Sequence, residues 1–329
     1  MRKITIEDIS RDTGLSRGTV SRALNDKPDI SVQTKQRVME AVTRLKYVPS
    51  HAARSLATGR NFAVTVLVGD LQSTLNAGIL RGIMGQAHAA HYMVEVIETG
   101  TNSIADSLGS LSPERVDAVL NVAPFEQHDA LQLKNAVENR LLCSTWPLEG
   151  INGDTFTPDF AEAGRIAARV FLRNGIREIL YIHTPNQPGA NAQLNGFQEI
   201  CRENGINPED STATIEGLPD FERIQARIQR ARGIAAANDF LACAAQMRVL
   251  AEGRKPGADV AIIGFGNEPI SRQISPDLTT LDAAGEEIGS RMMGTLLQRL
   301  SNERSDNPEY TRIAPVLIRR GTTQHLSTD

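Results

Sequence analysis

The residues with the clearest potential for chemistry form a short polar segment near the N-terminus. Arg17 and Arg22 carry guanidinium groups, which bind guanine edges or phosphates through paired hydrogen bonds. Hydroxyl side chains, which commonly contact phosphates, stand around them at Ser16, Thr19 and Ser21. Gly18 has no side chain, at a position where a second residue could otherwise read a base. These residue types favour contact with nucleic acid over catalysis.

Three short helices are predicted to position this segment. Thr5 precedes a helix with carboxylates in its first turn, and Gly14 is a residue type that commonly ends helices. Ser16 begins a second helix, and Ser31 begins a third that reaches about Leu45. Two helices joined by a short glycine-containing turn form a helix-turn-helix, whose second helix enters the major groove of DNA. The apolar residues expected in the core are Ile9, Leu15, Val20, Leu24, Val38, Val42 and Leu45.

Charge is distributed unevenly along the chain. Residues 1–60 contain 12 Lys and Arg against 6 Asp and Glu, whereas the rest contains 23 against 33. A cationic module is attracted to phosphates and an acidic body is repelled by them. A basic, solvated face of a plain three-helix bundle remains the alternative to DNA binding.

The composition limits the classes of protein that fit. The chain has 329 residues, of which 40% are hydrophobic and 22% charged, which is typical of a globular protein with more than one domain. Glu7 and Asp8 stand where a secretory signal needs apolar residues, so we expect a cytoplasmic protein. No apolar run is long enough to predict a transmembrane helix. The three cysteines are widely spaced and predict no disulfide framework.

Motifs of known catalytic chemistry are missing from the sequence. There is no phosphate loop of the G-x-x-x-x-G-K-[ST] type and no G-x-S-x-G turn. His88 and His91 are three residues apart, but an isolated pair of this kind is more often a surface feature than a metal site. We therefore expect no enzyme activity, no cofactor and no metal.

From residue 61 onward, apolar runs alternate with amphipathic stretches. This alternation predicts parallel sheets in an α/β fold, and the length favours two lobes. Strands are expected at residues 62–68, 92–97, 116–122, 141–145, 178–182, 234–237 and 260–265. Helices are expected at residues 75–90, 161–173, 194–204, 221–231, 239–252 and 286–300.

Several motifs in the N-terminal segment together resemble a known family. They are Thr5-Ile6-Glu7-Asp8-Ile9, Gly14-Leu15-Ser16, Thr19-Val20-Ser21-Arg22, Leu45-x-Tyr47-Val48-Pro49, Ala53 and Leu56-Ala57. In this order and spacing they resemble the DNA-binding headpiece and hinge helix of LacI/GalR repressors. The resemblance implies that Arg17, Gly18 and Arg22 read bases, and that Leu56 enters the minor groove on a hinge helix that folds on DNA. The DNA-contacting residues that it implies are Thr5, Ser16, Arg17, Gly18, Thr19, Ser21, Arg22, Ser31, His51, Ala53, Arg54 and Leu56.

The rest of the chain resembles the same family less densely. The matching motifs are Leu80-Arg81-Gly82-Ile83, Gly164-Arg165-x-Ala167, Leu194-x-Gly196-Phe197, Ala237-Asn238-Asp239, Ile262-x-Gly264-Phe265 and Leu278-Thr279-Thr280. The resemblance implies an all-α helix-turn-helix headpiece followed by an α/β two-lobed core like that of periplasmic binding proteins, with parallel sheets. We expect a DNA-binding domain at 1–48, a hinge helix or linker at 49–60, and an effector-binding and dimerisation domain at 61–329 with crossovers near 155–160, 282–285 and 308–313.

The ligand cleft that the resemblance implies departs from the pattern of sugar-binding members. Those members have an Arg before the L-x-G-F motif and an Asp after the G-F strand, where this chain has Gln193 and Gly266. Loss of the carboxylate permits an anionic ligand, because a buried carboxylate would repel it. The stretch from Gly264 to Asn267 is similar to that of gluconate-type regulators, so we hypothesise a sugar acid, with Arg81 or Arg272 as its cationic partner. The candidate effector residues are Gln72, Ser73, Asn76, Trp146, Phe160, Asn191, Gln193, Asn238, Gly266 and Asn267.

The function that the resemblance implies is that of a sequence-specific transcriptional regulator, a repressor that binds a palindromic operator as a homodimer. A small metabolite, a sugar or a sugar acid such as gluconate, would control it. The alternative is control by a protein corepressor without a small-molecule inducer. An enzyme or a transport protein with the same fold is disfavoured, because the catalytic motifs and an export signal are missing. For Trp146, a place in the core and a place against the ligand remain equally open.

Overall fold

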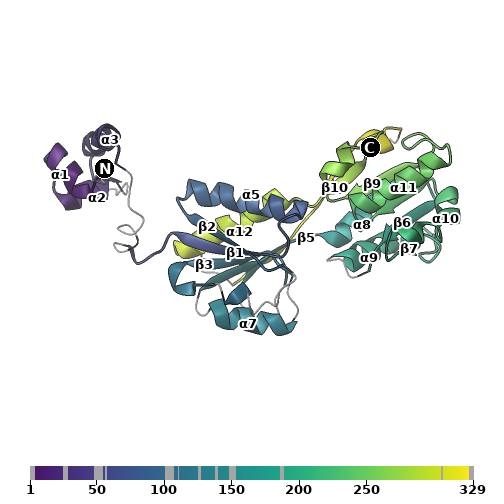
Figure 1. The fold of residues 1–329 in the computed structure, drawn as a ribbon, viewed down its shortest axis with the longest axis horizontal. Helices are drawn as coiled ribbons and strands as arrows, with labels where there is room; N and C mark the ends of the chain where they lie inside the picture. Colours follow the sequence, from purple (N-terminus) through teal and green to yellow (C-terminus); the bar gives the residue numbers. More distant parts are fainter. Residues whose placement is uncertain are drawn as a thin grey trace. The chain divides into compact units, whose positions relative to one another are not determined.

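The computed structural model describes residues 4–24, 29–47, 55, 58–100, 107–109, 111–124, 127–137, 140–147, 153–185, 189–304 and 307–325. The chain divides into two compact units, Met1–Phe62 and Ala63–Asp329. Figure 1 shows both units, with many of their elements labelled. Among the described residues, no helix combines the length and the apolar character needed to cross a membrane.

The described part of the first unit contains three helices, α1 (Ile6–Thr13), α2 (Arg17–Leu24) and α3 (Val32–Leu45). They confirm the three helices predicted from the sequence. Gly14 ends α1 in a left-handed conformation with φ of 66°. Ser16 and Ser31 begin the next two helices, because their hydroxyl oxygens accept hydrogen bonds from the backbone N–H of Thr19 (3.1 Å) and Thr34 (3.2 Å).

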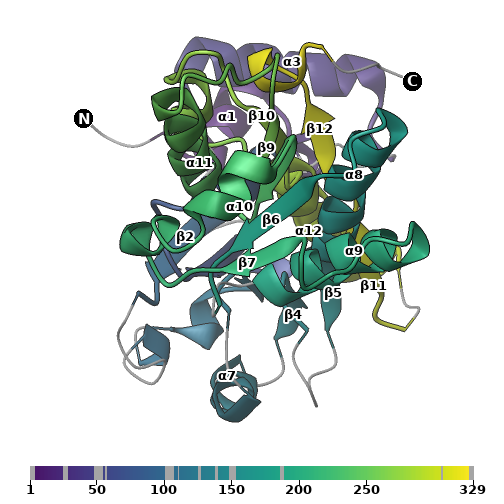
Figure 2. The same ribbon diagram turned by 90° about the vertical axis from the view of Figure 1, so that its right-hand side faces the viewer.

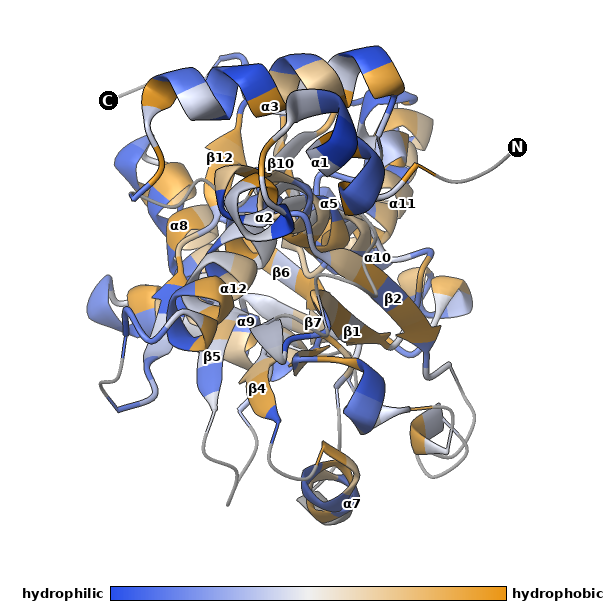
Figure 3. Ribbon diagram, turned by 90° about the vertical axis from the view of Figure 1, so that its left-hand side faces the viewer, coloured by the Kyte–Doolittle hydropathy of each residue, from blue (hydrophilic) through white to orange (hydrophobic). Residues whose placement is uncertain are grey.

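The core of the first unit includes all seven predicted residues, but they are buried to different degrees. Ile9, Val20 and Val38 are fully buried, as expected. The four other predicted core residues only pack against the edge of this cluster. The centre is completed instead by three residues that the apolar pattern did not select, Ala23, Ala41 and Tyr47. The small side chains of Ala23 and Ala41 fit between short helices that cross closely. Figure 3 shows that hydrophilic and hydrophobic positions alternate along α3, as expected for a helix with one buried face.

Two six-stranded sheets organise the described part of the second unit (Figures 1 and 2). We call the parts built on them the N-lobe, with strand order β11-β5-β4-β3-β1-β2, and the C-lobe, with strand order β12-β10-β9-β8-β6-β7. All paired strands are parallel except β10 and β12. This arrangement confirms the predicted α/β class with parallel sheets.

The N-lobe strands are β1 (Ala63–Val68), β2 (Met93–Glu98), β3 (Ala118–Asn121), β4 (Leu141–Ser144), β5 (Asp154–Pro158) and β11 (Tyr310–Ile313). Its helices are α5 (Thr74–Ala89), α7 (Gln127–Val137) and α12 (Gly285–Leu300), with a 3-10 turn at Pro113–Arg115. Figure 1 shows α5 and α12 on one face of the sheet and α7 on the other. Each face therefore has its own apolar core.

The C-lobe strands are β6 (Ile179–His183), β7 (Thr212–Thr214), β8 (Gly233–Ala236), β9 (Ala261–Phe265), β10 (Thr279–Asp282) and β12 (Val316–Ile318). Its helices are α8 (Phe160–Arg173), α9 (Ala190–Glu203), α10 (Gln225–Arg230) and α11 (Asp239–Ala251), with 3-10 turns at Leu218–Phe221, Pro269–Arg272 and Gly321–Thr323. Helices α8 and α9 pack on one face of the sheet, and α10 and α11 on the other.

The predicted strands and helices of this unit correspond to observed elements, with two kinds of difference. The predicted helix at 221–231 is shortened to α10, and Phe221 instead ends the 3-10 turn Leu218–Phe221. The apolar pattern does not predict helix α7 or the five strands β5, β7, β10, β11 and β12, because the strands are short and lack a continuous apolar run. The chain passes between the lobes after β5, between β10 and α12, and between β11 and β12.

Glycines allow the helices in each lobe to touch backbone to backbone. On α5 and α12, a Cβ added at Gly82 or Gly289 would overlap a carbonyl oxygen of the facing helix. The same holds for Gly164 and Gly196, where α8 meets α9. Three of these glycines belong to the motifs that carried the family resemblance. Their spacing therefore has a structural reason, which is the close approach of paired helices.

Candidate functional site

The residues predicted to bind DNA from α2 lie on one exposed face. The side chains of Arg17 and Arg22 are 65% and 64% exposed, and Gly18 is exposed between them. Thr19 and Ser21 are partly exposed. The opposite face of α2 is buried in the core. The helix therefore presents guanidinium and hydroxyl groups together to the outside of the unit.

Both arginines of α2 form ion pairs that DNA can replace. Arg17 pairs with Glu7, and the Arg22 Nη1 atom lies 3.0 Å from Asp29 Oδ2. Exposed ion pairs contribute only about 0–1 kcal/mol, because water screens the charges. Both guanidinium groups can therefore exchange these partners for a phosphate or a base edge at little cost.

The three remaining described candidates, Thr5, Ser16 and Ser31, stand at helix N-termini, which attract anions. Ser31 heads α3, whose first turn contains no acidic residue. Thr5 heads α1, but its hydroxyl and its backbone N–H both donate to Asp8 Oδ2 at 2.9 Å. Ser31 is therefore better placed than Thr5 to meet a phosphate. The hinge candidates His51, Ala53, Arg54 and Leu56 lie outside the described residues.

A cavity of about 810 Å³ lies where α5, the loop after β9 and the start of α12 meet. Three predicted effector residues line it, namely Gln72, Gly266 and Asn267. Arg81 and Arg272, the two suggested cationic partners, line it as well. Three carboxylates also border this cavity, on Asp282, Glu286 and Glu287.

Asn267 links the cavity wall to the crossover between β10 and α12. Its Nδ2 donates to Asp282 Oδ2 at 2.8 Å, and its Oδ1 accepts from Arg320 Nη2 at 2.6 Å. Asp282 in turn accepts from the backbone N–H of Ala284 at 2.8 Å, directly before α12 begins. A ligand that competes for Asn267 would therefore act on a chain of hydrogen bonds that reaches the crossover.

A buried carboxylate, that of Asp239, holds the loop after β9 through hydrogen bonds. Asp239, at the start of α11, accepts hydrogen bonds from Thr280 Oγ1 at 2.5 Å and from the backbone N–H of Glu268 at 2.7 Å. Burial raises the pKa of Asp239 to about 6, although both hydrogen bonds act in the opposite direction. Sequence reasoning did not select Asp239, Asp282 or Arg320. The only feature of the sequence that could have identified one of them is that Asp239 belongs to the family motif Ala237-Asn238-Asp239.

The other polar effector candidates serve local structure in this conformation. Ser73 and Asn238 cap α5 and α11 by accepting from backbone N–H groups, and Asn76 Nδ2 donates to the Asp70 carbonyl at 2.9 Å. Gln193 is buried and accepts from the Tyr181 hydroxyl at 2.7 Å. Asn191 is exposed in the first turn of α9. The structure does not bring these five residues to the cavity.

The aromatic candidates pack against each other. Trp146, after β4, stacks on Phe160 at the start of α8, with ring centroids 5.7 Å apart and an interplanar angle of 10°. Phe160 also contacts Phe265, at 5.8 Å between ring centroids. Trp146 Nε1 donates to the carbonyl of Val122 at 3.1 Å. These contacts favour a packing role for Trp146 over a platform for a ligand.

Comparisons with known proteins agree with this arrangement. Residues 5–50 match the family model for bacterial regulatory proteins of the lacI family, and residues 157–323 match the model for the periplasmic binding protein-like domain. The HTH-type transcriptional regulator RegA of Clostridium saccharobutylicum is 25% identical, over 97% of this chain and 99% of its own length. The HTH-type transcriptional repressor PurR of Histophilus somni is 26% identical, over 98% of this chain and 99% of its own length.

A solved structure has a similar fold over nearly the whole chain. The lac repressor dimer bound to operator and the anti-inducer ONPF has a TM-score of 0.72 and 20% sequence identity, and the match covers 98% of this chain and 99% of that one. The relatives are a transcriptional regulator and repressors rather than enzymes, which agrees with the expectation that the chain has no catalytic activity.

Proposed function

Because the chain belongs to the lacI family of bacterial regulatory proteins, with a periplasmic binding protein-like domain after its helical unit, we propose that it represses transcription as a homodimer on a palindromic operator. The observation that carries this proposal is the exposed face of α2, where two arginines and two hydroxyl side chains stand together, with Ser16 directly before the helix. A small metabolite in the cavity beside Asn267 controls operator binding. The protein acts in the cytoplasm, where it meets DNA.

Selection from random double-stranded DNA, at fixed salt and without effector, tests operator binding directly. A two-fold symmetric site is expected, because the two headpieces of a dimer read equivalent half-sites. Weak binding that ignores sequence and disappears at higher salt would contradict the proposal. By analogy with the family, we propose that Leu56 contacts a central CG step of this site.

Arg22→Ala is expected to weaken binding to the selected operator by about tenfold to a hundredfold, because the variant loses a contact to a base or a phosphate. Fluorescence anisotropy at constant salt measures the change. Arg11→Ala is the control, since Arg11 is also exposed and also pairs with an acidic neighbour, but lies on α1. Equal losses in the two variants would mean that only general charge is being measured.

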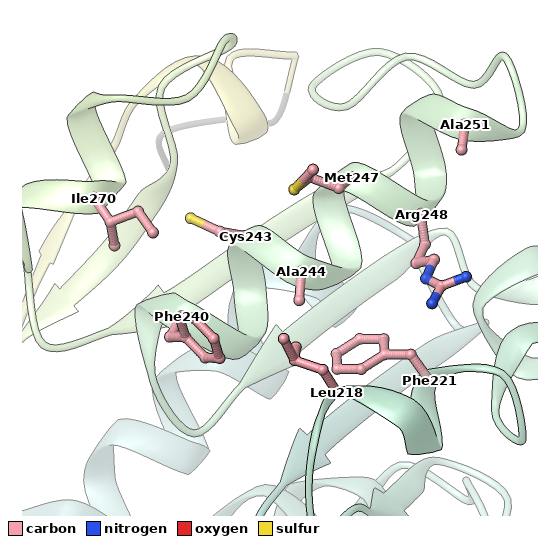
Figure 4. Close-up of a pocket in the computed structure, with 9 residues that line it drawn as sticks. All are labelled: Leu218, Phe221, Phe240, Cys243, Ala244, Met247, Arg248, Ala251 and Ile270. Atoms are coloured by element: carbon pink, nitrogen blue, oxygen red, sulfur yellow. The ribbon is translucent and has the colours of Figure 1, made fainter.

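An exposed apolar face on the C-lobe supports the homodimer. Phe240 and Met247 of α11 are 51% and 64% exposed, and they line a groove of about 460 Å³ between α11 and Leu218–Phe221 (Figure 4). Large apolar side chains gathered on one face are typical of a surface that a partner covers. A two-fold operator requires two headpieces, so the occupant that we propose is the same face of a second copy.

Met247→Asp is expected to convert the dimer into a monomer, because a carboxylate buried in an apolar interface loses its hydration. Sedimentation velocity measures the assembly state. Leu131→Asp is a matched control, since Leu131 is 63% exposed but lies on α7 in the other lobe. A Met247→Asp chain that remains dimeric would exclude this face as the interface.

For the cavity we propose a sugar or a sugar acid such as gluconate. Gln72 and Asn267 carry amides that suit hydroxyl groups, and Arg272 has no carboxylate partner among the described residues. Arg81, by contrast, forms an ion pair with Glu286, with 3.6 Å between Arg81 Nη1 and Glu286 Oε2. Arg272 is therefore the residue that we assign to the carboxylate of the ligand.

Arg272→Gln is expected to weaken gluconate binding by about tenfold or more, because a charged hydrogen bond is lost, and to leave glucose binding unchanged. Titration calorimetry measures both ligands, with Arg223→Gln as an exposed control. Binding of glucose alone would contradict the sugar acid. If the chain binds neither gluconate nor glucose and represses only when a second protein is present, the result would favour a protein corepressor instead.

A further inference from the structure

A second polar cavity, of about 310 Å³, lies on the C-lobe between α8 and the segment formed by β12 and Arg319. Helix α8 and strand β12 lie side by side in Figure 2. Three arginines line this arginine pocket, Arg169 and Arg173 from α8 and Arg319 from the segment after β12, and no carboxylate residue is among its lining residues. It shares no lining residue with the cavity beside Asn267.

The positive charge of the arginine pocket is only partly balanced by its surroundings. Glu162 pairs with Arg169 at 2.9 Å, but the same carboxylate also pairs with Arg165 at 2.7 Å. Arg173 and Arg319 make no ion pair with any carboxylate in the described ranges. Arg173 is exposed at the end of α8. At least two guanidinium charges are therefore available to a ligand.

Arg319 gives a second, independent indication of a missing acceptor. Its Nη1 atom is buried and has no hydrogen-bond partner within the described part of the chain. A buried guanidinium N–H without an acceptor is unfavourable, because the group has lost its water and gained nothing in return. An anion in the arginine pocket would supply that acceptor.

We propose that the arginine pocket binds the phosphate group of a small phosphorylated metabolite. Guanidinium groups match the oxygens of phosphate in paired hydrogen bonds, and a dianion suits several cations better than a single carboxylate does. Ile166, Val170 and Leu317 line the rest of the pocket and offer an apolar surface to the carbon part of the ligand. The volume is that of a site for a small molecule rather than for a protein.

The position of the arginine pocket gives such a ligand a route to regulation. Helix α8 follows the first passage of the chain between the lobes, and β12 follows the third. A phosphate held by Arg173 and Arg319 would join these two segments. This inference does not depend on the operator or on the ligand of the other cavity.

The test uses the full-length chain and two probes, glycerol 3-phosphate and inorganic phosphate, in calorimetry and thermal unfolding at constant ionic strength. We expect glycerol 3-phosphate to bind more tightly than inorganic phosphate and to raise the unfolding temperature. Arg173→Gln and Arg319→Gln should each weaken binding by about tenfold or more. Arg230→Gln, an exposed arginine on α10, should change nothing.

Arg173 is exposed, so its replacement tests the proposal even if the Arg319 variant folds poorly. Stabilisation by sodium chloride equal to that by either phosphate at the same ionic strength would overturn the proposal. Unchanged affinity for glycerol 3-phosphate in both the Arg173→Gln and Arg319→Gln variants would also overturn it. The same holds if the chain binds a phosphorylated protein but neither of the two small probes.

Discussion

Replacing Gly289 by alanine is expected to destabilise the second unit by about 3 kcal/mol or more. A Cβ at this position would overlap the backbone carbonyl of Ile79 on α5. Backbone cannot move aside as a flexible side chain can, so α12 would have to separate from α5. That separation would open the apolar cluster that the two helices form with β1 and β3.

Urea unfolding followed by tryptophan fluorescence measures this effect. The chain contains one Trp, and it lies in the second unit, so the signal reports on that unit alone. Gly294→Ala is the control on the same helix, because a Cβ there meets open space. It should raise stability by up to about 1 kcal/mol through better helix propensity. Equal effects of the two substitutions would show that the close contact with α5 is unimportant.

Asp154→Asn is expected to cost about 3–5 kcal/mol, because the buried guanidinium of Arg299 loses the charge of this carboxylate. The side chains of Asp154 and Arg299 are only 3% and 11% exposed. Arg299 donates to both carboxylate oxygens, at 2.5 and 2.6 Å. Asp154 also accepts from the backbone N–H of Glu309 at 3.0 Å. One carboxylate therefore connects the start of β5, the end of α12 and the residue before β11.

The same fluorescence measurement distinguishes this buried pair from an ordinary surface pair. Glu287→Gln is the control, because Glu287 pairs with Arg291 at 2.6 Å on the same helix, but both side chains are about half exposed. Its loss should cost no more than about 0.5 kcal/mol. If Asp154→Asn unfolds at the same urea concentration as Glu287→Gln, burial does not strengthen the Asp154–Arg299 pair.

The sequence by itself determined the parts of this protein that depend on local signals. Helix caps such as Ser16 and Ser31 act within three residues, and Gly14 ends α1 through its own backbone, so the three N-terminal helices could be read directly. The polar face of α2 follows from helical periodicity. The alternation of strands and helices likewise predicted the α/β class, because each apolar run belongs to one element.

Only the tertiary structure decided which polar residues meet. Asn267 contacts Asp282 and Arg320, which are 15 and 53 residues further along the chain, whereas Gln193 turns to Tyr181 in the core. Strands such as β7 and β12 contain three residues and depend on neighbouring strands for their hydrogen bonds. A hydrogen bond requires proximity in space, which no spacing along the chain specifies. The cavity wall and the arginine pocket therefore became visible only after the sheets had brought distant segments together.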